Sequence, residues 1–273
     1  MKTMLIIFLS CIIMNCDGQK PIWKSDTLIT KSKEMYYIPN VNSNLETFDF
    51  QKTKEETLKI PSKAAGLQNP DSKISSYSYT GKLDDNRTIY RSYYEIRDKK
   101  NIKEFGESYP LEIIYYNNSP FIIQKTFFPN GNIKEKGLKI VQGNLYKGTW
   151  FYFDEKGKLI NTIDNDKLFG FSWEQIEKFM EENKIEMLLG NGNHGHNSIN
   201  RWSPFLYPQS SEKNSTQKVD RNLWSITYKG EGWNQYFEVV LDGDTGKILK
   251  RTKYWVSEEG EDVPEPIIED FSK

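Results

Sequence analysis

The sequence predicts an α+β protein that is mainly antiparallel β, with a β-meander of hairpins followed by a helix packed on a small antiparallel sheet. Aromatic residues make up 14% of the 273 residues, and β-sheets accommodate large rings readily. Between residues 77 and 163, aromatic and β-branched runs alternate with turn residues at a spacing of about ten residues, which is typical of a meander. One clear helical pattern follows, and it begins at Ser172.

The composition excludes several classes of protein. The 37 Lys and Arg residues against 38 Asp and Glu residues give a formal charge of −1, without the basic excess of a nucleic-acid-binding protein. The chain has two cysteines, Cys11 and Cys16, so neither a disulfide framework nor a cysteine-rich zinc site is expected. A catalytic histidine would have to be His194 or His196. We therefore expect no cofactor and no nucleic-acid partner.

Residues 1–15 are predicted to be a signal peptide. Lys2 precedes an apolar run from Met4 to Met14, which has the length of a signal-peptide core and is too short to span a membrane. The segment Ile12-Ile13-Met14-Asn15-Cys16 resembles the lipobox of bacterial lipoproteins. The resemblance implies cleavage before Cys16, lipid attachment to Cys16 and anchoring to the membrane on the extracytoplasmic side of the bacterial cell envelope. The alternative is an ordinary secreted protein in which Cys16 has no role.

The mature chain divides into four predicted regions. Residues 16–70 form the lipid anchor and an irregular tether, because prolines interrupt every longer periodic pattern. Residues 71–165 form the β-meander, and residues 166–256 form an α+β module. Residues 257–273 are predicted to be an acidic, solvated tail.

The strands of the meander are expected at 88–96, 111–116, 121–128, 139–141, 149–153 and 159–163. Asn130-Gly131 is a hairpin turn sequence, because these residues adopt positive φ angles at low cost. The sequence Phe127-Phe128-Pro129-Asn130-Gly131-Asn132-Ile133 aligns with 152–159 if the second unit has one extra turn residue. With Gly148-Thr149-Trp150 between them, the stretch 127–160 resembles the bacterial MORN-type repeat. The resemblance implies a sheet that contacts proteins or lipids and carries no catalytic residues.

The helix has a capping box, in which Ser172 is the N-cap residue and Gln175 is at N3, and we expect it to end at Gly190. Three strands are expected after it, at 223–228, 236–241 and 248–255. Residues 172–255 resemble the PepSY domain of bacterial envelope proteins through Trp224, Tyr236, Glu238, Val239, Leu241, Asp242, Thr245, Gly246, Lys247 and Ile248. The resemblance implies binding or inhibition of a peptidase, or a role as an extracytoplasmic accessory module.

Several motifs have the residue types of a chemical site without its context. The glycines of residues 190–195 follow a helix, whereas a dinucleotide fingerprint follows a strand and opens a helix. His194 and His196 are weak metal candidates, because only Glu186 is nearby as a third ligand. Residues 242–246 fit a hairpin turn better than a calcium loop, and Ser172 fits an N-cap better than a nucleophile. We expect no catalytic residue and no metal.

A binding surface is the remaining expectation. Trp150, Tyr152, Trp233 and Trp255 are its candidate residues, either for glycan stacking or, as rings on strands more often are, as core and cross-strand contacts. The sequence predicts a non-enzymatic, membrane-anchored lipoprotein that binds a protein partner in the envelope or modulates a peptidase. The alternatives are an immunity- or antitoxin-like lipoprotein, and a hydrolase that uses the loop 190–221.

Overall fold

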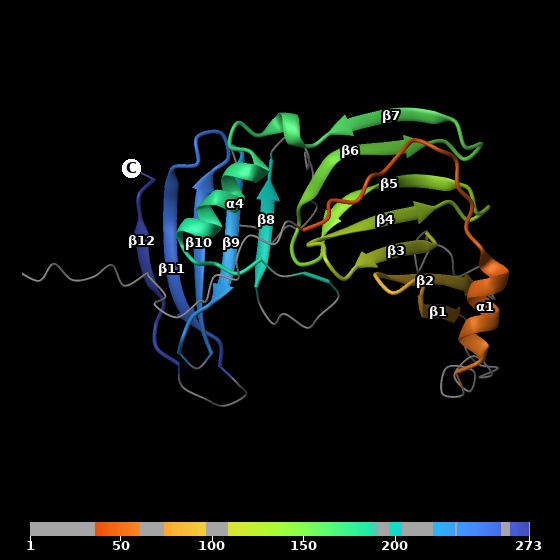
Figure 1. The fold of residues 1–273 in the computed structure, drawn as a ribbon, viewed down its shortest axis with the longest axis horizontal. Helices are drawn as coiled ribbons and strands as arrows, with labels where there is room; N and C mark the ends of the chain where they lie inside the picture. The colour runs from red at the N-terminus through yellow and green to blue at the C-terminus, as the bar shows by residue number, and fades with distance from the viewer. Residues whose placement is uncertain are drawn as a thin grey trace, which may run out of the picture.

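The computed structural model describes residues 36–60, 74–96, 109–187, 189–190, 197–203, 221–232, 234–257 and 263–272. In these ranges the chain is mainly antiparallel β, with a seven-stranded sheet, a five-stranded sheet and few helices (Figure 1). The predicted α+β class dominated by antiparallel strands is confirmed at this level.

The seven-stranded sheet is a meander in which each strand pairs antiparallel with the next along the chain. Its strands are β1 (Ile74–Lys82), β2 (Arg87–Ile96), β3 (Leu111–Tyr116), β4 (Phe121–Phe127), β5 (Ile133–Ile140), β6 (Tyr146–Phe153) and β7 (Leu159–Asp164). β5 is longer than the predicted 139–141. Its Lys and Glu residues obscure the apolar–polar alternation of a strand, and pairing with the neighbouring strand β4 extends it. β1 contains mostly Ser, Thr, Tyr and Gly, which carry little apolar signal.

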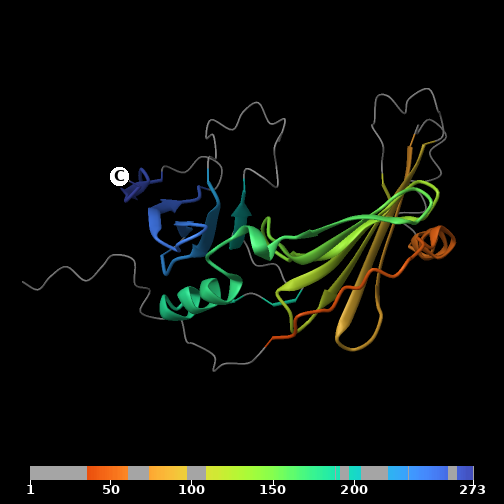
Figure 2. The same cartoon turned by 90° about the horizontal axis from the view of Figure 1, so that it is seen from above.

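Part of the predicted tether is ordered against this sheet. Residues 36–49, here called the strap, run along one face of the sheet and lead into the helix α1 (Phe50–Leu58) beside β1 and β2 (Figure 2). The strap pairs with the start of β5, where the Phe48 N–H donates to the Gly131 carbonyl at 2.8 Å. α1 begins at the N-cap residue Asp49, whose side chain accepts from the Lys52 N–H. Its buried Thr57 hydroxyl lies 3.0 Å from the Ser78 carbonyl of β1, so α1 rests on the edge of the sheet.

The two related turns of the meander have the same geometry. The Phe128 N–H donates to the Asn132 carbonyl and the Gly131 N–H donates to the Phe128 carbonyl. The equivalent bonds in the second turn run from Asp154 to Lys158 and from Gly157 to Asp154. The two turns therefore have equal length, and the extra turn residue in the sequence alignment is wrong. Phe127 and Phe153, each buried at the end of its strand, are the equivalent positions.

The five-stranded sheet has the order β12-β11-β10-β9-β8, and all of its strands are antiparallel. Its strands are β8 (Ser198–Trp202), β9 (Leu223–Lys229), β10 (Gln235–Asp242), β11 (Ile248–Trp255) and β12 (Ile267–Asp270). β8 lies in a polar stretch that predicted no strand. β12 lies in the segment expected to be a solvated tail, and pairing with β11 gives it order that its acidic sequence does not indicate.

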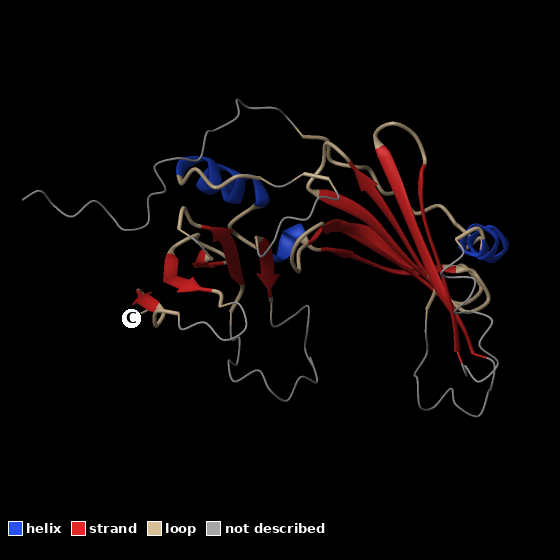
Figure 3. Cartoon of the chain, turned by 90° about the horizontal axis from the view of Figure 1, so that it is seen from below, coloured by secondary structure: helices blue, strands red, loops and turns tan. Residues whose placement is uncertain are grey.

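The helix α4 (Trp173–Glu182) packs on one face of this sheet (Figures 2 and 3). Its capping box is present, and the Ser172 N–H donates to the Gln175 side chain at 2.8 Å. The helix ends before Gly190, in contrast to the prediction. Lys184 takes a left-handed φ of 56°, and the Ile185 N–H reaches back to the Met180 carbonyl, as in a Schellman motif.

A common core joins the two sheets. Phe121 and Leu145 from the seven-stranded sheet and its turns pack in one cluster with α4 and with Trp224 of β9. Arg201 of β8 reinforces this junction, because its guanidinium lies over the Phe169 and Trp224 rings and pairs with Asp166 at 3.1 Å. It also donates to the Tyr146 carbonyl at the start of β6.

Candidate functional site

The two faces of the seven-stranded sheet differ in what covers them. The strap and aromatic clusters pack on one face, with Phe48, Tyr93 and Phe127 at the centre of one cluster. In the part of the chain that the structure describes, no helix or strand lies over the opposite face (Figures 2 and 3). We call this second surface the open face.

The strand registers align the side chains of the open face in three rows across the sheet. The rows combine rings and aliphatic side chains with hydroxyl and amide groups, and their charged side chains are Lys82, Glu135 and Lys139. The rows are Ser78, Ser92, Leu111, Thr126, Glu135, Tyr152 and Asn161; Thr80, Tyr90, Ile113, Gln124, Gly137, Trp150 and Ile163; and Lys82, Thr88, Tyr115, Ile122, Lys139 and Tyr146.

Trp150 forms the floor of the open face. Its indole lies against Gly137 on the neighbouring strand, where a Cβ atom would collide with the ring. The indole N–H donates to the Leu138 carbonyl at 2.9 Å, and the Tyr146 ring stands edge-on at 4.6 Å between centroids. Because Trp150 is only 3% exposed, it supports the surface while its neighbours form the contact layer.

Two half-buried tyrosines of the open face, Tyr115 and Tyr152, have raised pKa values. Burial raises the pKa of Tyr115, and the nearby Tyr90 adds to the shift. Burial, followed by the charge of Glu135, raises the pKa of Tyr152 to about 12. Their hydroxyl groups are therefore available as hydrogen-bond donors as well as acceptors.

The covered face holds a chain of buried charges. Lys136, 1% exposed, donates to the Asn44 carbonyl and to Glu46, each at 2.6 Å. Lys125 lies between Glu46 and Glu112, and Glu112 also accepts from Arg91 at 2.7 Å. Burial alone would raise the pKa of Glu46, but Lys125 and Lys136 hold it below its ordinary value. These groups are used to fix the strap to the sheet.

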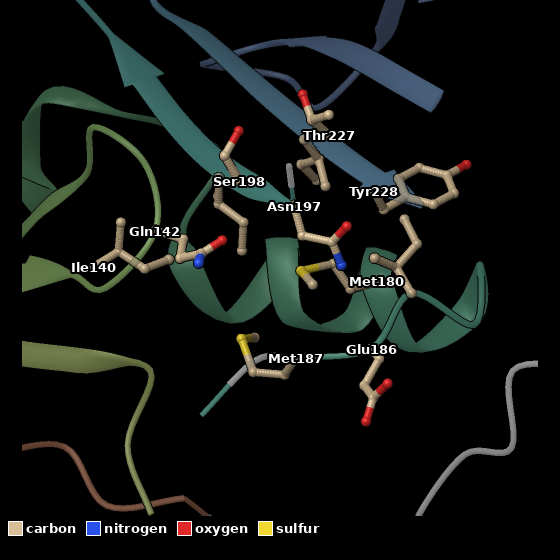
Figure 4. A pocket seen from close by; sticks show the side chains of 12 residues that line it. Ile140, Gln142, Met180, Glu186, Met187, Asn197, Ser198, Thr227 and Tyr228 are labelled. Carbon is tan, nitrogen blue, oxygen red and sulfur yellow. The ribbon is translucent and has the colours of Figure 1, made fainter. Parts of the chain in front are cut away.

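A small cavity lies at the junction of the two sheets, between α4, β8 and β9 (Figure 4). The amides of Gln142 and Asn197 and the thioethers of Met180 and Met187 surround it, whereas the Tyr228 hydroxyl points away (Figure 4). Its volume of about 30 Å³ holds about two water molecules and no substrate of ordinary size. The cavity therefore gives no support for a catalytic site in the described residues.

The structure places the predicted site residues as follows. Trp150 and Tyr152 lie together on the open face, whereas Trp255 lies in the other sheet, on β11, with the Lys253 ammonium 5.1 Å from its ring centroid. Trp233, His194, His196 and Cys16 lie outside the described residues. Sequence reasoning missed Tyr90 and Tyr115. Strand alternation in the runs 88–96 and 111–116 would have identified them, because each has its ring on the face opposite buried Ile89 or Ile114.

The described ranges of the chain contain no group of three or more His, Cys, Asp or Glu side chains arranged to hold a metal ion. No helix within them is both long enough and apolar enough to cross a membrane.

Comparison with known proteins adds no relative. No protein-family model, no curated protein and no solved structure matches this chain.

Proposed function

We propose that this protein is a non-enzymatic, lipid-anchored protein of the bacterial cell envelope that binds a protein partner through the open face. The single observation that carries the proposal is the composition of that face: half-buried tyrosines and aliphatic side chains, separated by hydroxyl and amide groups, with few charges. Protein interfaces are enriched in aromatic residues and depleted of charge at their centre. Tyr, Ser and Asn are also the residues that binding loops of antibodies use most.

The size of the open face fits this role. Seven strands about 4.8 Å apart span about 29 Å. A standard interface buries about 800 Å² per partner, which corresponds to a patch about 28 Å wide. A glycan, the alternative ligand for exposed rings, would need accessible ring faces, and the largest ring of this face, Trp150, is 3% exposed.

The resemblances in the sequence support the same proposal. We propose that the turns at 128–132 and 154–158 belong to MORN-like units, that the meander precedes a PepSY-like module formed by α4 and the five-stranded sheet, and that Cys16 carries the lipid. The MORN-type resemblance implies contact with proteins or lipids, and the PepSY resemblance implies binding of a peptidase or an accessory role, so neither implies chemistry. The buried carboxylate of Glu112 and the partly buried carboxylates of Glu46 and Asp166 are each paired with cations, which favours a structural role for them.

A site-specific cross-linking experiment tests the proposal. A photoreactive amino acid would replace Tyr90 or Tyr115 on the open face, and in a matched control it would replace Tyr37, which is 47% exposed on the strap. Irradiated envelopes should yield one discrete protein adduct from the open-face positions and none from position 37. The double variant Tyr90→Ser/Tyr115→Ser, with the cross-linker at Tyr146, should lose that adduct while still unfolding in a cooperative transition above the assay temperature.

Two results would contradict the proposal. Equal adducts from position 37 would show that cross-linking is nonspecific. Retention of a soluble neutral oligosaccharide by the wild type, with loss in the double variant, would show that the open face binds glycans instead.

The proposed anchor has its own test. Cells that express the chain are supplied with an alkyne-labelled fatty acid, and the purified protein is assayed for the label. We expect incorporation in the wild type and none in Cys16→Ser, with Cys11→Ser as the matched control that keeps the label. A labelled Cys16→Ser protein would remove the anchor from the proposal.

A further inference from the structure

The two edge strands of the five-stranded sheet differ in whether their outer backbone groups are hydrogen-bonded. The edge strand β8 is bonded to the β5–β6 turn, because the Ile199 N–H donates to the Gln142 carbonyl and the Arg201 N–H to the Asn144 carbonyl at 3.1 and 3.0 Å. The opposite edge strand, β12, pairs with β11 on one side, and no strand among the described residues pairs with its other side. An open edge presents backbone donors and acceptors that a further strand can use.

The alternation of hydrogen-bonded pairs between β11 and β12 shows which residue of β12 directs its backbone N–H and C=O toward the unpaired side. The Phe271 N–H donates to the Leu249 carbonyl at 2.7 Å, and the register pairs Glu269 with Arg251 and Ile267 with Lys253. In an antiparallel ladder, hydrogen-bonded and non-hydrogen-bonded pairs alternate. Ile268 therefore directs its N–H and C=O away from β11, toward the open side.

The side chains of this edge are apolar and exposed. Ile268 is 57% exposed on the face of Thr252, and Ile267 is 43% exposed on the face of Lys253. Val263 and Phe271, before and after the strand, are 37% and 41% exposed. Edge strands usually avoid such side chains, because apolar edges promote pairing with other chains.

The edge strand of the seven-stranded sheet provides a contrast. β7 also exposes apolar residues, with Ile160 at 61%, but the Asn161 side chain accepts from the Thr162 N–H at 2.9 Å. A side chain thus occupies a backbone donor of β7 that a further strand would need. No such contact is present at Ile268 among the described residues.

Pairing of β12 with a second copy of itself is unfavourable in the two-fold registers centred on Ile268, Glu269 and Asp270. If Ile268 faces Ile268, the neighbouring outward position is Pro266, which has no N–H to donate. The next registers place Glu269 opposite Glu269 or Asp270 opposite Asp270, and directly opposed like charges destabilise a sheet. A different chain with basic residues opposite Glu269 and Asp270 avoids both the missing N–H of Pro266 and the opposed carboxylates.

We propose that β12 accepts an extended segment of a partner protein as an additional antiparallel strand, with an apolar residue opposite Ile268 and basic residues opposite Glu269 and Asp270. Backbone hydrogen bonds to Ile268 supply affinity, and the isoleucines and carboxylates supply selectivity. This inference deepens the proposed function, on which it rests for protein binding as such, but it uses a surface separate from the open face.

The probe is a fluorescent synthetic peptide of valine and lysine, about six residues long, the usual length of a strand. It contains the sequence Lys-Lys-Val, so that in antiparallel pairing the two lysines face Asp270 and Glu269 when the valine faces Ile268. Its anisotropy is measured against the full chain with Cys16→Ser. We expect binding of this peptide, and binding at least about tenfold weaker for a valine–glutamate peptide, because cross-strand charge pairs each contribute modestly. On binding, the Ile268 amide should gain protection from hydrogen exchange.

Three variants make the result specific. Ile268→Pro removes the outward N–H and should weaken binding by about tenfold. Ile268→Thr keeps this N–H and a β-branched side chain, so it should bind more tightly than Ile268→Pro. Ile160→Pro, the same change on the other exposed edge, should leave binding unchanged.

The inference is overturned if Ile268→Pro binds as well as the wild type, or if the valine–lysine peptide does not bind at about 1 mM. It is also overturned if the wild type is a dimer that Ile268→Pro dissociates, because a second copy then occupies the edge. Failure of the peptide with intact open-face cross-links removes this inference alone. Loss of the open-face cross-links with normal peptide binding removes the proposed open-face function alone.

Discussion

At the scale of single residues, Lys136 has the least favourable environment for a charge. The residue is almost fully buried, and its ammonium group donates to the Asn44 carbonyl and to Glu46, both on the strap. An unpaired charge in such a place is costly, so the ion pair ties the strap to the sheet. Glu46 and Lys136 are 90 residues apart in sequence, and no local pattern connects them.

Removal of Glu46 should therefore destabilise the protein through Lys136. We expect Glu46→Ala to lower the free energy of unfolding by about 3 kcal/mol, because it leaves a buried cation without its counter-charge. Glu46→Ala/Lys136→Met should recover part of that loss, since the second change removes the buried charge that has no counter-charge. Urea unfolding of the two variants and the wild type measures this, and a double variant no more stable than Glu46→Ala would contradict it.

The same residue makes stability depend on pH. Lys125 and Lys136 hold the pKa of folded Glu46 below its ordinary value of 4.5, although burial opposes this. The stabilisation is present above pH 4.5 and is lost as the pH falls through the folded pKa, because the unfolded chain binds the proton more tightly.

Glu46→Gln should accordingly show a flatter loss of stability on acidification than the wild type. Asp166, whose pKa is also lowered, titrates in both proteins and cancels in the comparison. Urea midpoints between neutral pH and about pH 3 measure the difference. Parallel curves would assign the acid sensitivity to other groups.

At the scale of elements, the two related turns depend on glycines in the left-handed region. Gly131 has φ of 89° and Gly157 has φ of 84°. A Cβ atom at Gly131 would lie 3.1 Å from the Phe50 ring, and one at Gly157 would lie 3.2 Å from a Leu45 methyl group. The turns thus contact the strap and the first residue of α1 as well as reversing the chain.

Alanine at either position should cost about 1–2 kcal/mol from backbone strain, with an added cost from the strap contact. Gly148→Ala is the control, since Gly148 has φ of 63° but no atom within 4 Å of an added Cβ. Asn at 131 should cost less backbone strain than Ala, because Asn adopts this region more readily. Thermal melts compare the series, and an equal loss at 131, 157 and 148 would show that the strap contacts contribute nothing.

At the scale of the whole molecule, the two sheets share one core and should unfold together. Arg201 lies at the junction, with its side chain 2% exposed and paired to Asp166. Arg201→Met removes that pair and both cation–ring contacts while keeping apolar volume. We expect a loss of about 3 kcal/mol and separate unfolding of the two sheets.

Differential scanning calorimetry distinguishes joint unfolding of the two sheets from separate unfolding. The wild type should give one transition and Arg201→Met two. Lys167→Met is a suitable control, because the Lys167–Asp164 pair is exposed and lies beside the same junction. One transition in Arg201→Met would show that the apolar core alone couples the sheets.

The amino-acid sequence alone predicted the elements whose signals are local. The runs 88–96, 111–116 and 248–255 became strands with nearly those bounds, and the capping box at Ser172 starts α4. Turn glycines and helix caps act through contacts between residues close in sequence, so a local sequence pattern is enough to predict them. The elements that were missed, α1, β1, β8 and β12, are short or rich in polar residues and gain their order by packing on or pairing with other strands.

Only the tertiary structure decided which surfaces are covered. Trp150 and Tyr152 were candidate binding-surface residues. Strand alternation could have assigned Tyr90 and Tyr115 to one face of their own strands, but strand register decides that all four residues share the same face of the sheet. The strap covers one face because buried charges on distant strands require its carboxylate, and the opposite face stays open. In the same way, β8 is closed by the β5–β6 turn and β12 is left as an edge. Long-range pairing determines which groups face solvent, and one-dimensional patterns do not contain it.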